Sequence, residues 1–331
     1  MIRNVSKILI IRFSSIGDIV LTTPVIRCLK QQLPLVKVYY LTKSGFRQVL
    51  ENNPYIDCTI TFDKSLSEVK KQLITEDFDL IIDLHHNLRT LKVKNWLKVP
   101  SYSFPKLNVE KWLLVNLKLN KLPNTHIVDR YLETTKSLEI INDQKGLDYF
   151  IPKEDVVDIK EELPTDFHAG YVGLVIGAQH FTKRLPNKKL IELCSIIDKP
   201  VVLMGGPMDK AVADEILQNS DGVIFNSCGL FNLNQSASLV KQAKVVVSHD
   251  TGLMHIAAAF NKPIISIWGN TVPEFGMYPY KVTNEFRSEI KELACRPCSK
   301  IGHNKCPLGH FKCMEQQDLK EISRKITQFW N

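Results

Sequence analysis

The sequence predicts an α/β protein with two domains, each built on a mostly parallel sheet covered by helices. Short apolar runs alternate with helical patterns in the first half, and the alternation starts again at Tyr171. Such alternation is typical of parallel sheets. The 331 residues exceed one typical domain. We therefore expect two Rossmann-like domains, residues 1–165 and 166–315, facing each other across a cleft, and a C-terminal helix at 316–331.

The first unit opens with a continuous apolar run that only Arg12 interrupts. Strands are expected at 8–13, 36–41, 58–62 and 78–84. A helix should begin at Pro24, because proline suits a first helical position, and shorter helices are expected at 46–50 and 66–74. Residues 100–165 are less regular. They predict helices near 112–119 and 128–138 and a charged connection at 152–164.

In the second unit strands are expected at 172–176, 201–204, 223–225, 244–247 and 262–268. Helices are expected at 186–197 and at 233–243. Two further helices are expected, one between these two and one after the Asp250 turn. Near the end of the chain, Leu319, Ile322, Ile326 and Phe329 share one helical face. That last helix follows the second sheet, so it has the option of docking elsewhere.

Composition indicates an ordinary globular protein, with 44% hydrophobic and 24% charged residues. The net charge is +8, but the basic residues form no block interleaved with aromatics, which gives little support to nucleic-acid binding. An anionic substrate or an anionic membrane surface explains the excess equally well. No apolar run approaches the roughly 20 residues that span a membrane, and we expect a cytoplasmic protein.

Eight cysteines fall into two groups. Cys28, Cys58, Cys194 and Cys228 are spread through predicted core elements and are expected to be buried. The other four, Cys295, Cys298, Cys306 and Cys313, cluster near the end of the chain with His303 and His310. The C-x-x-C pair resembles a structural zinc site, but the later spacings fit no standard finger. We favour a metal-free thiol cluster in a reduced compartment.

The most informative motif is the turn Asp250-Thr251-Gly252, which follows an apolar strand and opens into a helix containing His255. The free N–H groups and positive dipole end of a helix N-terminus favour phosphate. Ligands of open α/β sheets bind at the carboxyl ends of strands. These features predict a pocket for a nucleotide diphosphate, although a simple Asp250 helix cap is the alternative.

Three further loops carry candidate chemistry. The loop after the first strand, 12–18, offers Asp18 as a general base, or equally as a helix cap. The loop 177–186 contains Lys183 and Arg184, which would neutralise a leaving diphosphate unless it is simply a solvated basic loop. Arg89 and Arg130 suit an anionic acceptor. For these two the alternative is a surface pair of Asp129 with Arg130 and a capped turn. Asp77-Phe78-Asp79 has the D-x-D pattern of some manganese sites. It lies at the entrance of its strand and not at the exit, so we interpret it as a chance match.

Together the motifs resemble the bacterial lipopolysaccharide heptosyltransferases of glycosyltransferase family 9. The resemblance rests on R-F-S-S-I-G-D-I-V-L-T-T-P at 12–24, the Lys183-x-x-Pro186 loop, S-H-D-T-G-L-M-H at 248–255 and the cysteine segment 295–314. It implies the GT-B arrangement and an inverting, metal-independent transfer of heptose from ADP-heptose to the lipid A–Kdo inner core, with no cofactor. The chain departs from the family at 178–182, where members often carry a Thr- or Ser-rich loop.

The resemblance also implies roles for individual residues. Asp18 and Lys183 match catalytic positions. The implied acceptor-binding residues are Ser15, Gly17, Arg89 and Arg130. The implied donor-binding residues are Gly177, Thr182, Lys183, Gly205, Gly206, Asp250, Thr251, Gly252, Leu253 and His255. The partners would be a nucleotide sugar and a lipopolysaccharide precursor at the inner membrane surface. A sugar-nucleotide epimerase and a non-catalytic nucleotide-sugar binder are the competing interpretations.

Overall fold

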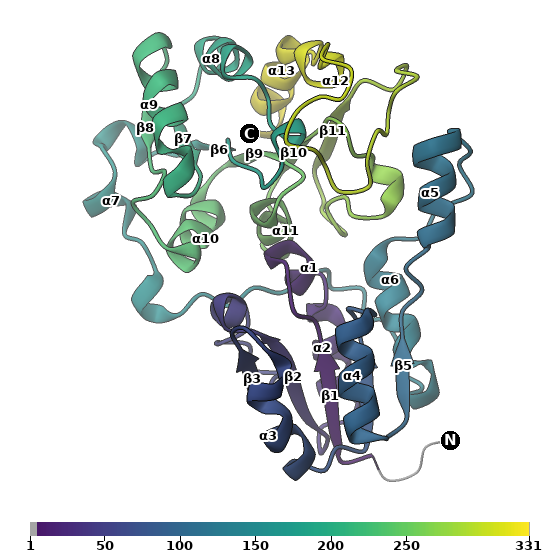
Figure 1. Cartoon of the computed structure of the whole chain (residues 1–331). Helices are drawn as coiled ribbons and strands as arrows, with labels where there is room; N and C mark the ends of the chain where they lie inside the picture. The colour runs from purple at the N-terminus through teal and green to yellow at the C-terminus, as the bar shows by residue number, and fades with distance from the viewer. Residues whose placement is uncertain (1–4, 331) are drawn as a thin grey trace. The chain divides into compact units, whose positions relative to one another are not determined.

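The computed structural model describes residues 5–330, which divide into two compact units (Figure 1). Unit 1 contains the described residues up to Lys106 together with Thr125–Phe150, and unit 2 contains Leu107–Asn124 and everything from Ile151 on. The predicted boundary at residue 165 therefore needs two corrections. Residues 107–124 leave the first unit because Leu114 packs on Val272 and Phe275, and residues 151–165 also belong to unit 2.

Unit 1 is a five-stranded parallel sheet in the order β3-β2-β1-β4-β5. Its strands are β1 Lys7–Ile11, β2 Lys37–Lys43, β3 Cys58–Phe62, β4 Leu80–Asp83 and β5 Ser101–Ser103. Its helices are α1 Ile16–Val20, α2 Thr23–Gln32, α3 Lys70–Thr75, α4 Leu88–Leu97 and α6 Ile127–Leu132, with 3-10 turns η1 Ser44–Val49, η2 Leu66–Val69 and η3 Glu133–Leu138. Because alternate strand residues face opposite sides, Leu9 and Ile11 join one core cluster with Leu73 and Val93 from α3 and α4.

Unit 2 is a six-stranded parallel sheet in the order β11-β10-β9-β6-β7-β8. Its strands are β6 Val172–Val175, β7 Val201–Met204, β8 Ile224–Asn226, β9 Val245–His249, β10 Ile264–Trp268 and β11 Glu285–Glu289. Its helices of eight residues or more are α5 Asn108–Leu117, α8 Asn187–Ile196, α9 Lys210–Asn219, α10 Leu233–Gln242, α11 Gly252–Ala259 and α13 Leu319–Trp330. Shorter helical turns are η4 Lys153–Asp155, α7 Ile159–Glu162, η5 Thr165–Phe167, η6 Phe181–Lys183, η7 Pro207–Asp209, η8 Pro273–Phe275 and α12 Lys312–Glu315.

The predicted α/β class with parallel sheets is confirmed, and the apolar strands fall where the sequence placed them. The last helix does not dock elsewhere. Leu319, Ile322 and Ile326 of α13 join the core of unit 2 with residues of α8 and β9. The helix expected at 128–138 is α-helical only to Leu132 and continues as a 3-10 turn. Of the four cysteines expected in the core, Cys58 is only partly buried, because it begins the edge strand β3.

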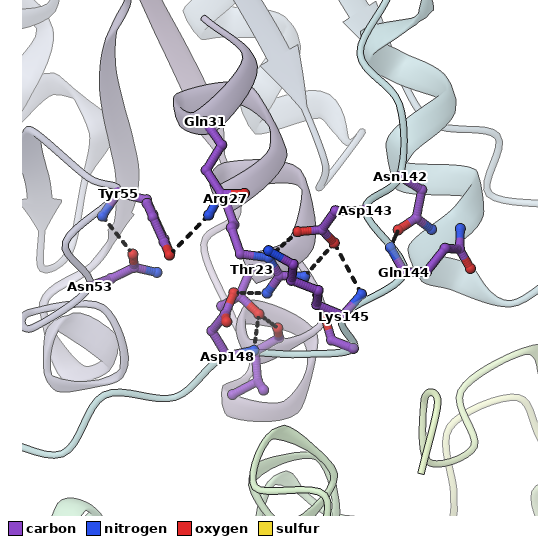
Figure 2. Close-up of polar contacts among 12 residues, drawn as sticks. Thr23, Arg27, Gln31, Asn53, Tyr55, Asn142, Asp143, Gln144, Lys145 and Asp148 are labelled. Atoms are coloured by element: carbon purple, nitrogen blue, oxygen red, sulfur yellow. Dashed lines mark hydrogen bonds and ion pairs between the residues drawn. The ribbon is translucent and has the colours of Figure 1, made fainter. Parts of the chain in front are cut away.

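The end of unit 1 is fastened to α2 by one buried arginine (Figure 2). Arg27 donates to both oxygens of Asp143 at 2.7 and 2.9 Å, to the carbonyl of Gly146 at 2.9 Å, and pairs with Asp148. Hydrogen bonding to Arg27 lowers the pKa of Asp143 to about 2. The pKa of Asp148 is raised, because burial outweighs its attraction to Arg27. The two carboxylates therefore depend on a single cation.

Replacing that cation should destabilise unit 1. We expect Arg27→Ala to lower the free energy of unfolding by about 3–5 kcal/mol, the usual cost of leaving a buried charge without its partner. Chemical denaturation of the whole chain measures it. The matched control is Arg47→Ala, which removes a 3.8 Å pair with Glu51 whose side chains are 58% and 50% exposed. The control should cost no more than about 1 kcal/mol. Equal losses in the two variants would contradict this account.

Candidate functional site

Each sheet has one point where the strand order reverses. In unit 1 the reversal lies between β1 and β4, and in unit 2 between β6 and β9. At such a point the loops leaving two neighbouring strands turn apart, which opens a crevice at the carboxyl ends of the strands. The loops that the sequence singled out leave these strands. Residues 12–18 and 84–89 follow β1 and β4, whereas 176–186 and 250–252 follow β6 and β9.

In unit 1 the candidate base Asp18 lies in the first turn of α1, which follows the loop after β1, and both of its carboxylate oxygens have partners. Its Oδ1 pairs with the Arg12 guanidinium at 2.7 Å. Its Oδ2 accepts from the Ser15 hydroxyl at 2.8 Å and from the Ser15 amide at 3.2 Å. Asp18 therefore completes a capping box at the start of α1, as the structural alternative expected. Its side chain is still 20% exposed, so it can be reached from solvent.

Arg12, for which the motifs predicted no role, organises this loop. Arg12 donates to the carbonyls of Ser14 and Leu84 at 2.8 and 2.6 Å and to the Tyr131 hydroxyl at 3.0 Å. Burial disfavours its charge, but Asp18 and Tyr131 more than compensate and raise the pKa of Arg12 above its ordinary value. Arg12 thus joins the loops after β1 and β4. The sequence did carry a signal for this role, because Arg12 is the single charged residue in the apolar run 8–13.

Positive charges surround the segment that follows β4. Burial and the positive charges of Arg12, Lys106 and Arg89 together lower the pKa of His85 to about 3, so its ring is neutral at pH 7. Arg89 is exposed and lies over the Phe13 ring at 5.2 Å. Asp83, fully buried, pairs with Lys94 and accepts from the amides of the 85–86 turn. Arg89 is therefore placed to meet an anion from solvent.

Arg130 differs from what the surface-pair interpretation required. It is 2% exposed, and its Nη1 donates to the carbonyl of Pro105 at 3.3 Å. Asp129 accepts from the Asn142 amide at 3.2 Å. The predicted surface pair of Asp129 with Arg130 is therefore wrong, because Arg130 is buried. The turn preceding α4 is capped as expected, since the Asn87 side chain accepts from the amides of Arg89 and Thr90. Asp79 of the D-x-D string binds the backbone of Ser6 and Lys7, which is a structural role.

In unit 2 the reversal point brings together Lys183 and Asp250. Lys183 Nζ lies 2.6 Å from Asp250 Oδ2, and the Thr271 hydroxyl donates to the same oxygen at 3.1 Å. Asp250 does not cap α11, because the cap residue is Thr251, whose hydroxyl instead contacts Ser248 at 3.1 Å. The first turn of this eight-residue helix thus has no side-chain cap. Uncapped N–H groups beside a lysine form a site suited to an anion.

The neighbouring glycines make room for a second ion pair. Asp209 is 8% exposed, accepts from the Gly206 amide at 2.9 Å and pairs with Arg184 at 3.2 Å. A Cβ on Gly177 would lie 2.2 Å from Asp209 Oδ2, and one on Gly205 would lie 2.8 Å from Asp209 Cβ. A side chain at either position would therefore displace Asp209, and the loops after β6 and β7 need glycine there. Asp209 was not predicted, because it lies four residues beyond Gly205 in a 3-10 turn and belongs to no motif.

The loop 177–186 is also held by the side chain of His249. The buried His249 ring accepts from the Leu185 amide through Nε2 at 3.0 Å, so the proton of the neutral ring lies on Nδ1. Burial lowers the pKa of His249 to about 4. Thr182, predicted to bind the donor, is 1% exposed, and its hydroxyl contacts the backbone of His303 at 2.8 and 3.2 Å. His255 likewise lies 2% exposed within α11.

The cysteine segment supports this loop. Phe181 stacks on Phe311 with ring centroids 5.3 Å apart, and Arg296 holds the carbonyls of Gly269 and Thr271 at 2.6 and 3.0 Å. Cys313 is buried, and Cys295, Cys298 and Cys306 are partly buried. Burial and the neighbouring cysteines raise the pKa of Cys298 and of Cys313, the latter to about 12. Within residues 5–330, no three His, Cys, Asp or Glu side chains are grouped to hold a metal ion.

Residues 66–307 match the model of glycosyltransferase family 9 (heptosyltransferase), which is more than half of the chain. The chain belongs to glycosyltransferase family 9. This membership makes it a glycosyltransferase, which removes the epimerase and the non-catalytic binder as competing interpretations.

Individual members of family 9 resemble the chain over most of its length. Lipooligosaccharide heptosyltransferase 2 of Haemophilus ducreyi is 25% identical over 296 residues, covering 81% of this chain and 85% of that protein. A family 9 glycosyltransferase from Veillonella parvula has the same fold, with a TM-score of 0.81, 21% identity and coverage of 100% and 98%. The ADP complex of the E. coli heptosyltransferase WaaC aligns with a TM-score of 0.69, 21% identity and coverage of 98% and 99%.

The neutral state of His249 predicts a pH dependence of stability. Its pKa of about 4 lies below the value of about 6.5 expected when unfolded, so the unfolded chain binds more protons between these values. This contribution is complete above pH 6.5 and is lost as the pH falls toward 4, by on the order of 3 kcal/mol. We expect His249→Gln, which keeps an acceptor near Nε2 but cannot be protonated, to flatten the unfolding free energy between pH 6.5 and 4.5.

The lowered pKa of His85 also makes the unfolding free energy rise with pH. The test therefore compares wild type with the His249 variant in parallel denaturation series at several pH values. The matched variant His85→Gln should remove a separate part of the slope. If the unfolding free energy depends on pH equally in wild type and in His249→Gln, the assignment of a neutral, buried ring to His249 is wrong.

Proposed function

We propose that this glycosyltransferase moves heptose from ADP-heptose to the inner core of a lipopolysaccharide precursor, with inversion and without a metal or cofactor. Its membership of the heptosyltransferase family and the anion site at the β6–β9 reversal carry the proposal. Unit 2 binds the donor, and unit 1 binds the acceptor and supplies the base. The protein works at the cytoplasmic face of the inner membrane, where that precursor is exposed. No helix in residues 5–330 is long and apolar enough to cross a membrane.

On the donor side, Lys183 and the uncapped amides of Thr251, Gly252 and Leu253 would bind the diphosphate. Charge develops there as the glycosidic bond breaks, and preorganised donors stabilise it without a metal. Asp250 holds the lysine at the strand end until the diphosphate competes for it. Gly177 and Gly205 leave room for Asp209, which accepts from the Gly206 amide and holds Arg184 beside the loop. Thr182 holds the loop through the backbone of His303, and His255 is buried in the helix that follows the turn.

On the acceptor side, Asp18 would take the proton of the attacking hydroxyl as its oxygen bonds to the anomeric carbon opposite the diphosphate. Both Asp18 oxygens already accept hydrogen bonds, so one must be released. The Ser15 hydroxyl can rotate away and leave Oδ2 to the acceptor, whereas Arg12 keeps Oδ1 oriented. Gly17, buried in the first turn of α1, keeps that turn compact. Arg89 would bind an acidic group of the acceptor, and the buried Arg130 holds the carbonyl of Pro105.

The transfer itself is tested by incubating the protein with ADP-heptose and a detergent-dispersed lipid A–Kdo acceptor. ADP release and the anomeric configuration of the product are measured. We expect ADP release only with acceptor, an inverted linkage, and full activity in EDTA. Isomerised donor in the absence of acceptor, a retained linkage, or loss of activity that Mg²⁺ or Mn²⁺ restores would each contradict a part of the proposal.

Replacing the base gives the sharpest mechanistic test. Asp18→Asn should cut turnover by about a hundredfold or more, the usual worth of a general base, while ADP binding stays as in wild type. Its matched control is Ser15→Ala, which removes the neighbouring hydroxyl but leaves the carboxylate and its arginine, and should have a much smaller effect. Turnover of Asp18→Asn near the wild-type value would remove Asp18 from the mechanism.

A further inference from the structure

Helix α5 (Figure 1) carries apolar residues both where it packs against the rest of unit 2 and where it is exposed. On one side Leu114, 8% exposed, packs with Val272 and Phe275 of unit 2, and Val115 and Leu122 lie against this cluster. Burial of this side anchors the helix on its unit. A helix that needs only one anchored side would carry polar residues on the other.

The exposed surface of α5 carries large apolar residues instead. Val109 is 68% exposed, Trp112 is 55% exposed and Leu117 is 53% exposed. Val109 and Trp112 are three residues apart, so they share the helix face that lies opposite Leu114. Leu117, three residues beyond Leu114, lies at the border between the buried and the exposed side. Leu119, 51% exposed, extends the patch beyond the helix end. We call Val109, Trp112, Leu117 and Leu119 the α5 patch.

The patch is held rigidly and lies in a basic segment. Lys118 Nζ donates to the carbonyls of Cys295 and Pro297 at 3.2 and 2.7 Å, which fixes the helix end on unit 2. Residues 107–124 contain three lysines and one glutamate. Two copies of this segment would repel each other in a symmetric contact, whereas an anionic surface attracts it.

A bilayer surface fits these features. A ten-residue helix is about 15 Å long, too short to span a membrane but suited to lying in the interface. Tryptophan favours the headgroup level, and nearby lysines are attracted to anionic lipids. We propose that the α5 patch docks unit 2 on an anionic membrane surface, with Trp112 and its apolar neighbours inserted among the headgroups. The inference deepens the proposed function and rests on it for its meaning, since a lipid-anchored acceptor lies in such a surface.

Co-sedimentation of the full chain with vesicles tests the proposal. Vesicles of phosphatidylcholine with phosphatidylglycerol should bind the protein, pure phosphatidylcholine should bind it much less, and salt should weaken the binding. The double variant Trp112→Gln/Leu117→Gln should lower the partition coefficient at least tenfold. Leu35→Gln/Ile141→Gln is the matched control, because these residues of unit 1 are 93% and 73% exposed yet lie outside the patch. The control should bind as wild type does.

Two further readouts keep the result specific. Thermal unfolding and transfer to the detergent-dispersed acceptor should be the same in the double variant as in wild type. Vesicle binding by the double variant equal to wild type would overturn the proposal. So would a dimer, seen by sedimentation, that the double variant disrupts while vesicle binding persists. A wild-type protein that binds vesicles through the patch but transfers no heptose would sink the proposed function and leave the docking surface standing.

Discussion

The reversal of strand order in each parallel sheet is the constraint on which the candidate site depends. A parallel sheet buries both faces under helices, so polar side chains can gather only at strand ends. At β1 and β4 they are Asp18, Arg12 and His85, and at β6 and β9 they are Lys183 and Asp250. The rest of each unit, including the buried apolar strands and their covering helices, holds these ends in register.

The two ends differ in their electrostatics. At the β6–β9 end, Lys183 and Arg184 are each paired with an aspartate, and the carboxylates hold these cations at the proposed diphosphate site. At the β1–β4 end, Arg12 is matched by Asp18, while Arg89 remains exposed over Phe13. Charges held before the substrate arrives need little reorganisation during the reaction, which is how preorganised sites stabilise developing charge.

The strands with long apolar runs could be predicted from the sequence because both of their faces are buried. The polar edge strands β5 and β11 could not, since Ser101–Ser103 and Glu285–Glu289 carry no apolar run. Helix α4 was missed because its sequence carries little amphipathic pattern beyond Thr90 and Val93. The assignment of residues 107–124 to unit 2 also escaped prediction, because it depends on the tertiary contact of Leu114 with Phe275.

The same limit applies to the site. Loops at strand ends could be found from pattern and motif, which brought Asp18, Lys183 and Asp250 to attention. The residues that hold these loops, Arg12, Asp209, His249 and Thr271, carried no motif, and only the fold shows their contacts. Burial also separates residues that the sequence treated alike. Arg89 is exposed, whereas Arg130 is 2% exposed and bonded to a backbone carbonyl.

The central claim is that the anion site for the donor lies at the β6–β9 reversal of unit 2. Calorimetric titration of ADP into wild type, Lys183→Ala and Arg89→Ala tests it most directly. A charge-assisted contact is worth roughly 1.5–3 kcal/mol, so Lys183→Ala should weaken ADP binding about tenfold or more. The Arg89 variant should bind ADP as wild type does. Loss of ADP affinity in Arg89→Ala, with unchanged affinity in Lys183→Ala, would contradict the account.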